Sequence, residues 1–318
     1  YNAGTNLQVL NCTVTAGATG NITATAPTTI NNAQISIGYE GTITTGIGGI
    51  GILNTANNIY IDTCIATGGA SCSITKTNTG ANRNTNIGSP NGYVLTAPAG
   101  DAILTTTNSR GTITDCVLST TNGGSVTVVA SNKYGSADGS AGGNGINCNG
   151  ANNLLIVNCL IKQTGSGGNG YRGANFFQPL HPGNGGNGGV GILVQPNCTN
   201  TQIANSTITN TGIGGTTGGA PATNGAGGHG IIALGQKTQI NNNTIAYTGS
   251  SIDSAASGLA ISCTDEVASA VYTNFAHNIA ASTAYFLAGI FPNSCAVDST
   301  SGTAFTAITY PLQNIYKP

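Results

Sequence analysis

Apolar and small polar residues recur along the chain in one short unit. In the segment NLLIVNCLIK, residues 153–162, the apolar Ile156 is followed three positions later by the small residue Cys159. Because the unit returns throughout the sequence, it predicts stacked short strands that turn equivalent side chains inward on every repeat. The copies are Val9-x-x-Cys12, Ile61-x-x-Cys64, Ile113-x-x-Cys116, Ile156-x-x-Cys159, Ile203-x-x-Ser206, Ile240-x-x-Asn243 and Phe275-x-x-Asn278.

A bend interrupts each unit. The next inward position, Ile161, lies two residues after Cys159, whereas Ile156 lies three residues before it. Strand side chains alternate with a period of two, so the extra residue predicts a tight corner between two strands. Asparagine tolerates the left-handed backbone that such a corner requires. The predicted corner residues are Asn11, Asn158, Asn205 and Asn242, and the inward residues after the corner are Val14, Ala66, Leu118, Ile161, Ile208 and Ile245.

A second apolar signal precedes most units by nine to eleven residues and usually follows glycine. It predicts a leading strand in each turn of the coil, so that a turn holds three short strands. No long segment carries the 3.6-residue apolar stripe of a helix, and glycine and β-branched residues dominate. The chain is therefore predicted to be all-β. The leading positions are Ile52, Ile103, Ile146, Ile192 and Ile231.

The repeats differ in length, and the excess falls between the third strand and the next leading strand. Gly165–Gly189 and Gly212–Gly228 are the clearest insertions, and both are rich in glycine and asparagine. Insertions at one point of a solenoid repeat project on one side, so we expect both on the same side of the coil. Alternating runs between Asn21 and Thr45 predict one more rung there.

These features resemble the right-handed parallel β-helix family, which includes pectate lyases, polygalacturonases, tailspikes and many adhesin passengers. The resemblance rests on the Asn-Cys, Asn-Ser and Asn-Asn corners and on the Gly-Ile leading strands, and it covers roughly residues 6–310. It implies a right-handed parallel β-helix of about seven or more rungs with glycine-rich loop insertions on one side. The Phe275-Ala276-His277-Asn278 copy is also similar to the FxxN repeats of chlamydial polymorphic outer-membrane proteins. We expect one elongated domain over residues 1–318, with 302–318 as a terminal strand or contact segment.

Composition narrows the classes of partner. Only 5% of residues are charged, against about 25% in average globular proteins. The net charge is −1 and no basic run occurs, so we expect neither nucleic-acid binding nor binding to anionic lipid. No apolar run reaches the ~18 residues of a membrane span. The chain has no methionine, so we expect a processed, secreted protein that acts outside the cell or on its surface, unless the chain was cut in another way.

Catalytic chemistry has little support in the sequence. A glycosidase on this fold needs carboxylates on neighbouring rungs of one face, and a lyase needs a base near an acid. Asp62 and Asp115 occupy different columns of the repeat, and Arg172 has no acid in its insertion. We therefore expect no catalytic residues, and no cofactor other than a candidate Ca²⁺ ion in an acidic region that is otherwise a solvated loop. The candidate calcium ligands are Asp253, Asp265, Glu266 and Asp298.

The densest group of aromatic residues lies in the insertion between Gly165 and Gly189. Exposed aromatic residues mark protein contacts, and beside polar groups they also hold sugars. Three interpretations stay open here: a contact between subunits, a ligand site, or a loop folded on itself. The residues of this candidate contact loop are Tyr171, Arg172, Phe176, Phe177 and His181.

Four of the nine cysteines fall in one inward column, namely Cys12, Cys64, Cys116 and Cys159. Rungs stack about 4.8 Å apart, which keeps parallel Cβ atoms beyond the roughly 3.5–4.5 Å of a disulfide. We therefore predict that most column cysteines are unbridged core residues. The candidate disulfides are Cys64–Cys72 and Cys263–Cys295.

Asn-x-Ser/Thr sequons offer candidate glycosylation sites. Three of the five coincide with predicted corners and should face solvent. The sequons begin at Asn11, Asn21, Asn197, Asn205 and Asn242.

Two functions remain after these exclusions. The first is a non-catalytic structural or adhesive surface protein, which associates head to tail into a homopolymeric filament through its uncapped terminal rungs. The alternative is a protein that binds or degrades polysaccharide with the insertion side of the coil. We favour the first because no catalytic constellation is evident.

Overall fold

The computed structural model describes most of the coil. The described residues are 6–18, 22–25, 35–37, 40–44, 47–55, 58–71, 73–78, 84–87, 91–95, 97–106, 110–130, 132–172, 183–251, 258–262, 273–276, 279–281, 287–288, 295–297 and 315–317.

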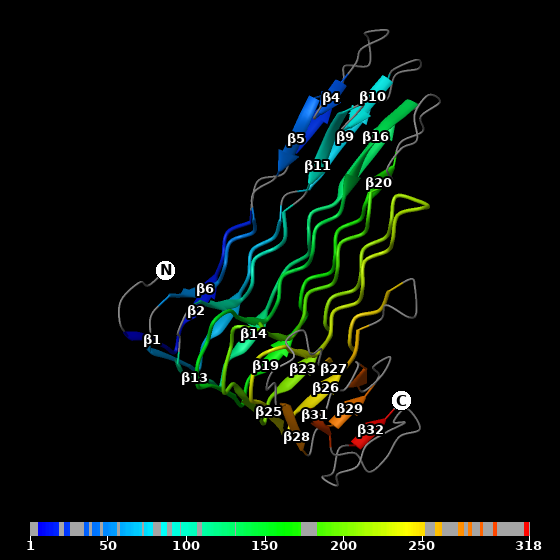
Figure 1. Ribbon diagram of the computed structural model, residues 1–318. Coiled ribbons are helices and arrows are strands. Elements are labelled where there is room, and N and C mark those ends of the chain that lie inside the picture. The colour runs from blue at the N-terminus through cyan, green and yellow to red at the C-terminus, as the bar shows by residue number, and fades with distance from the viewer. Residues whose placement is uncertain are drawn as a thin grey trace.

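The chain forms a parallel β-helix in which each turn contributes one strand to each of three long sheets (Figure 1). In chain order within a turn we call them the lead, middle and third sheets. The lead sheet contains β6 (Ile52–Asn54), β12 (Ile103–Thr105), β17 (Ile146–Cys148), β21 (Ile192–Val194), β24 (Ile231–Ala233), β27 (Ile261–Ser262) and β30 (Leu287–Ala288). The middle sheet contains β1 (Asn6–Leu10), β7 (Asn58–Asp62), β13 (Arg110–Thr114), β18 (Leu154–Val157), β22 (Gln202–Ala204), β25 (Thr238–Asn241), β28 (Thr273–Ala276) and β31 (Cys295–Val297). The third sheet contains β2 (Thr13–Thr15), β8 (Ile65–Thr67), β14 (Val117–Ser119), β19 (Leu160–Lys162), β23 (Thr207–Thr209), β26 (Thr244–Ala246), β29 (Ile279–Ala281) and β32 (Ile315–Lys317).

The predicted inward columns are the core. Ile113 pairs with Ile156, and Ile203 pairs with Ile240, in the same register on successive rungs. All four side chains are fully buried. Leading isoleucines such as Ile146 are buried with them, so one apolar core runs through the stack. Its stability comes from removing these side chains from water, at about 25 cal/mol for each Å² of apolar surface.

The corners between the middle and third sheets have the predicted backbone. Asn11, Asn158, Asn205 and Asn242 have φ between 50° and 55°. At most corners the small residue that follows donates a hydrogen bond to the carbonyl before the corner, as the Cys116 thiol does to the Thr114 oxygen at 3.0 Å. Asn243 instead donates through Nδ2 to the Ile203 oxygen of the preceding rung at 3.0 Å, and Cys12 on the first described rung is exposed. A small side chain with a donor fits this column, which explains why cysteine gives way to Ser206 there.

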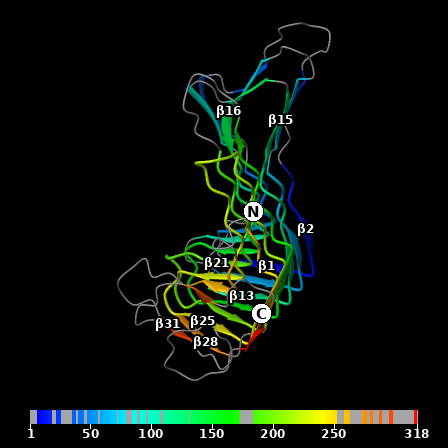
Figure 2. The same cartoon turned by 90° about the vertical axis from the view of Figure 1, so that its right-hand side faces the viewer.

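Long segments leave the coil on one side, as the repeat lengths predict, and they are regular (Figures 1 and 2). We call the segments after the third sheet outgoing and those before the lead sheet returning. Together they form what we call the glycine slab. The best described outgoing segments are 121–125, 164–170, 211–218 and 248–251, and the returning segments are 97–102, 139–145, 183–191, 225–230 and 258–260.

Glycine in the slab is required by space. Gly165 donates its N–H to the Gly143 oxygen at 3.2 Å, and Gly189 donates to the Gly165 oxygen at 2.6 Å, so outgoing and returning segments alternate. A Cβ added at Gly165 would overlap the Thr121 carbonyl oxygen, although φ at Gly165 is not left-handed. Packed glycines recur every third residue, as at Gly165 and Gly168. A period of three fits polyproline II geometry, which has no internal hydrogen bonds. The backbone groups of these segments bond instead to the neighbouring segments.

The outer end of the slab carries further strands. These are β3 (Ile22–Thr25), β9 (Ile74–Asn78) and β15 (Val126–Ala130) in one sheet, and β4 (Ile35–Ile37), β10 (Asn84–Ile87), β16 (Asn132–Asp138), β11 (Asn91–Leu95), β5 (Glu40–Thr44) and β20 (Tyr171–Arg172) in another. The alternating runs between Asn21 and Thr45 lie here. They extend the first insertion and do not form the additional rung that the sequence suggested, because they pair with other insertions.

Candidate ligand-binding trough

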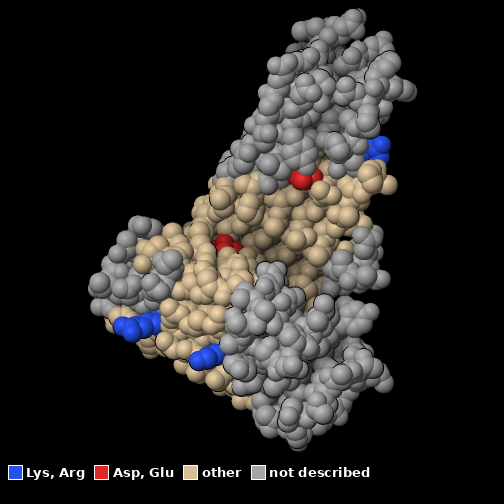
Figure 3. Space-filling view, in the orientation of Figure 1, with Lys and Arg blue, Asp and Glu red and all other residues tan. Residues whose placement is uncertain are grey.

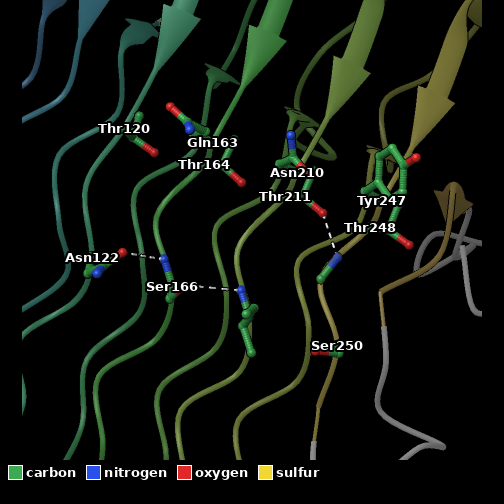
Figure 4. Close-up of a pocket in the computed structure, with 12 residues that line it drawn as sticks. Thr120, Asn122, Gln163, Thr164, Ser166, Asn210, Thr211, Tyr247, Thr248 and Ser250 are labelled. Atoms are coloured by element: carbon green, nitrogen blue, oxygen red, sulfur yellow. Dashed lines mark hydrogen bonds between the residues drawn. The ribbon is translucent and has the colours of Figure 1, made fainter. Parts of the chain in front are cut away.

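A trough of about 410 Å³ lies where the third sheet passes into the outgoing segments of the slab. It spans four successive rungs, and three columns of side chains line it (Figure 4). The lining residues are Thr120, Asn122, Gln163, Thr164, Ser166, Asn210, Thr211, Ile213, Tyr247, Thr248, Gly249 and Ser250.

The threonine column fixes the floor of the trough. The Thr164 hydroxyl donates to the Gly189 oxygen at 2.5 Å and accepts from the Gly212 N–H at 2.8 Å. Thr120 makes the same two bonds with Gly143 and Gly165. Each hydroxyl therefore ties an outgoing segment to a returning segment and to the next rung. The matching sequence signal is a Thr-Gly pair after β19, β23 and β26, as in Gln163-Thr164-Gly165, and the sequence analysis missed it.

The second column stands at the exit from the third sheet, in left-handed backbone. Gln163, Asn210 and Tyr247 have φ of 54°, 54° and 53°. Asparagine adopts this conformation readily, whereas a bulky aromatic residue there is an outlier that costs of order 1 kcal/mol. Tyr247 is nevertheless placed there with 59% of its surface exposed. Within the part of the chain that the structure describes, the side-chain amides of Gln163 and Asn210 make no hydrogen bond.

The third column belongs to a ladder of outward residues on the slab. The Asn122 Oδ1 accepts from the Ser166 N–H at 2.9 Å, and the Ser166 Oγ lies 3.4 Å from the Ile213 nitrogen (Figure 4). A polar side chain on one rung thus caps the backbone of the next. Ile213 breaks the ladder because its side chain has no acceptor, and it is 53% exposed.

Two residues of the trough depart from the pattern of the other rungs. Tyr247 is unfavourable for its backbone, and Ile213 is an exposed apolar residue where the ladder calls for a polar one. Both line the same hollow. Departures of this kind cluster at functional sites, where a ligand interaction offsets their cost.

The trough carries no formal charge, because all of its lining side chains are neutral. Figure 3 shows that few charged side chains lie on the described part of one face of the molecule. Among the described residues, no group of three or more His, Cys, Asp or Glu side chains could hold a metal ion. The same residues include no helix that could cross a membrane.

The sequence argument did not predict this trough, and the described residues of the candidate contact loop, Tyr171 and Arg172, do not line it. Tyr171 is buried inside the slab with β20, which pairs antiparallel with β16, and burial raises the pKa of its hydroxyl. The Arg172 guanidinium donates to the Ala220 oxygen at 2.6 Å. Phe176, Phe177 and His181 lie outside the described residues.

The candidate calcium ligands Asp253, Asp265, Glu266 and Asp298 also lie outside the described residues. Two other acids come closer than their different columns suggested, since Asp62 and Asp115 stand on successive rungs at the corner. Each accepts a hydrogen bond from an adjacent threonine, Thr63 for Asp62 and Thr114 for Asp115. They lie outside the trough.

The described cysteines are free thiols. They include Cys12, Cys64, Cys116 and Cys159 of the inward column, and also Cys148 and Cys198. The pairing of Cys64 with Cys72 is therefore not formed; the Cys64 thiol instead donates to the Asp62 and Val9 oxygens. Burial raises the pKa of Cys64 and Cys148, which keeps these thiols protonated and unreactive. Cys263 and Cys72, and the side chain of Cys295, are not described.

Four of the five sequons are described, and their asparagines are exposed: Asn11, Asn197, Asn205 and Asn242. Asn197 is engaged, since its Nδ2 donates to the Asn149 Oδ1 at 2.8 Å and its Oδ1 accepts from the Gly150 N–H at 3.0 Å. Asn21 lies outside the described residues.

Comparison with known proteins gives little guidance. No family model matches the chain, and no curated protein matches it. Among solved structures, the crystal structure of alginate lyase from Paenibacillus sp. str. FPU-7 aligns with 96% of this chain and 98% of that chain, at 12% identity and a TM-score of 0.17. A TM-score this low carries no argument about fold or function.

Proposed function

We propose that this protein is a non-catalytic, extracellular structural protein that adheres to polysaccharide through the trough. The observation that carries the proposal is the coincidence of Tyr247 and Ile213, both exposed, in an uncharged hollow lined by amides and hydroxyls. Binding sites typically combine an apolar surface with a few polar groups that fix orientation. Sugars match this pattern, because a pyranose presents C–H groups to an aromatic face and hydroxyls at its rim.

The rigid body around the trough supports an adhesive function. The columns on the trough floor are fixed by hydrogen bonds between Thr120, Thr164 and Thr211 and the glycine backbone. A site held in this way loses little conformational entropy when it binds. A non-catalytic role agrees with the trough lining, which includes no carboxylate.

Affinity electrophoresis in gels that contain neutral polysaccharides tests the proposal. We expect the protein to be retarded, and we expect Tyr247→Ala and Ile213→Ala to restore most of its mobility. Tyr60→Ala is the matched control, because Tyr60 is also exposed but lies on the middle sheet, away from the trough. Equal retardation of wild type and Tyr247→Ala would refute the trough as the binding site.

The same material tests the enzymatic alternative. We expect no new reducing ends or unsaturated products when the protein is incubated with the polysaccharides it binds. Turnover that Asp62→Asn or Asp115→Asn abolishes would instead show that the corner carboxylates catalyse degradation.

Filament formation is a second proposal, which the sheet ends favour. The middle sheet ends at β1 and at β31, and the third sheet ends at β2 and at β32. Terminal strands of a parallel stack can pair with a second copy, and head-to-tail pairing that does not close gives filaments. Negative-stain microscopy tests this: deletion of Thr303–Pro318, which includes β32, should abolish fibres, whereas persistent fibres would exclude this end as the contact.

A further inference from the structure

We infer that the ligand of the trough is a linear, neutral glycan that lies along the stacking axis of the coil and contacts several rungs at once. The inference rests on the proposed function and adds the direction, the charge and the minimum length of the ligand. Three observations support it: the lining repeats on each rung, the two ends of the trough differ, and the slab has a carboxylate at an equivalent position outside the trough.

The lining repeats once per rung. Asn122, Ser166, Ile213 and Ser250 occupy equivalent positions, because Gly123, Gly167 and Gly214 donate to the Ser166, Ile213 and Ser250 oxygens in turn. With strands about 4.8 Å apart, four rungs span about 14 Å. A site that repeats by translation along this length fits a ligand that repeats in the same direction. A linear polysaccharide has this property, whereas a single compact molecule does not repeat along the axis.

The two ends of the trough differ. Asn122, Gln163 and Ser166 make one end polar, whereas Ile213 and Tyr247 add exposed apolar surface at the other end (Figure 4). The aromatic face of Tyr247 provides a platform for one sugar ring. The exposed amides of Gln163 and Asn210 can then bond the hydroxyls of the rings that follow. We therefore expect every bound glycan to occupy the Tyr247 end first and to reach Asn122 only when it is long enough.

The neutral charge of the ligand follows from the ladder. In the outer part of the slab, the Asp138 Oδ1 accepts a hydrogen bond from the Asn184 N–H at 2.5 Å. The Asn122 Oδ1 accepts the equivalent bond from the Ser166 N–H in the trough. The slab therefore accommodates a carboxylate at such a position, yet the trough has none and has no cation either. A site for a charged polysaccharide would be expected to provide a complementary charge, so a glycan without charge fits best.

Neutral oligosaccharides of increasing length test the inference. They would be prepared from the polysaccharide that retards the protein in affinity electrophoresis. We would measure dissociation constants by calorimetry for chains of two to six sugars. We expect affinity to rise with length and to level off once the chain spans the four rungs. Tyr247→Ala should weaken binding about tenfold at every length, the loss of one stacking contact. Asn122→Ala should weaken only the longer chains, because the shorter ones do not reach it.

Tyr60→Ala is the matched control, because Tyr60 is also exposed but lies on the middle sheet and does not line the trough. We expect it to leave the affinity for neutral chains of every length unchanged. A flat length series in which Asn122→Ala has no effect would overturn the axial arrangement and leave polysaccharide binding intact. Tighter binding of an acidic than of a neutral oligosaccharide would overturn the neutral assignment. If no glycan of either kind binds, the proposed function itself fails, and the inference with it.

Discussion

The coil and the glycine slab are two ways of stacking the same parallel turns, and they depend on opposite properties of side chains. In the coil, isoleucine columns such as Ile113, Ile156 and Ile203 are completely buried, and the apolar side chains fill the space between the sheets. In the slab, the space between outgoing and returning segments is too small for a Cβ at Gly165 or Gly189. The coil is stabilised mainly by removing apolar surface from water, whereas the slab is stabilised by backbone hydrogen bonds and close backbone contact.

This contrast explains how each part tolerates change. The coil accepts Cys116, Cys159 and Ser206 in one column, because a small donor of any kind caps the corner. Many inner positions of the slab leave no room for a side chain, as at Gly165 and Gly189, and others hold only small buried residues such as Ala99 and Ser140. The outward positions vary more widely, among Asn122, Ser166 and Ile213, and the trough is formed on them.

The largest effect should follow from a charge in the coil. Ile156→Asp would bury an unpaired carboxylate in the core column, which costs several kcal/mol and should abolish folding. Leu155→Asp is the control, because its side chain points to the other face of β18 and is only partly buried. Circular dichroism and thermal melting would report the difference. A soluble Ile156→Asp protein that melts cooperatively would show that the coil does not depend on its apolar columns.

A methyl group in the slab should have the next largest effect. In Gly165→Ala the new Cβ would meet the Thr121 carbonyl, which cannot move without breaking the lateral hydrogen bonds. Overpacking of this kind costs about 1 to 3 kcal/mol. The neighbouring Ser166→Ala, which changes an outward residue, should stay within about 0.5 kcal/mol. Urea denaturation gives both values, and hydrogen exchange should show faster exchange at Gly189 and Gly212 in Gly165→Ala.

Equal stability of the two alanine variants would mean that the slab segments are not closely packed.

The boundary between coil and slab should make stability depend on pH. Asp101 is buried there and accepts hydrogen bonds from Asn144 and Asn147, and burial raises its pKa above the ordinary value of 3.8. Between that value and the raised one, the folded state binds more protons than the unfolded state. The contribution of Asp101 to stability should therefore be greatest at low pH and fall as the pH rises through this window. Urea titrations at several pH values should show this slope in wild type and not in Asp101→Asn.

His229, which immediately precedes the glycine before β24, should act in the opposite sense. Its Nδ1 accepts from the Leu259 N–H at 3.0 Å, and burial lowers its pKa below 6.5. The unfolded chain then takes up the proton first as the pH falls, so stability should decrease below about that value. Stability curves for wild type and His229→Gln should therefore diverge below about pH 6.5, because glutamine does not titrate. Parallel curves would show that the histidine is not held neutral.

Sequence reasoning predicted the coil more completely than the slab. The inward columns and the left-handed corners could be predicted because an apolar position repeats on each turn, as at Ile156, and asparagine occupies most of the corners, as at Asn158. The corners at Thr63 and Asp115 carry no such signal. The slab was predicted only as insertions on one side, since glycine-rich segments carry no apolar period. Its signal was a period of three, from Gly165 to Gly168. The trough could not be predicted for a related reason. Tyr247 and Ile213 line it together, but they belong to different rungs and lie far apart in the sequence.

The smallest effect on stability should come from a substitution in the trough. Unlike the substitutions in the coil and the slab, it should stabilise the protein. Tyr247→Asn places at a left-handed position the residue type that the preceding rung already has at Asn210. Relief of the backbone strain should stabilise the protein by about 0.5 to 1 kcal/mol. The same change removes the aromatic platform, so polysaccharide retardation should be lost while the melting temperature rises. The reciprocal variant Asn210→Tyr should destabilise by a similar amount. If Tyr247→Asn lowered the melting temperature, Tyr247 would be a structural residue of the third sheet, and the argument that it is retained for binding would fail.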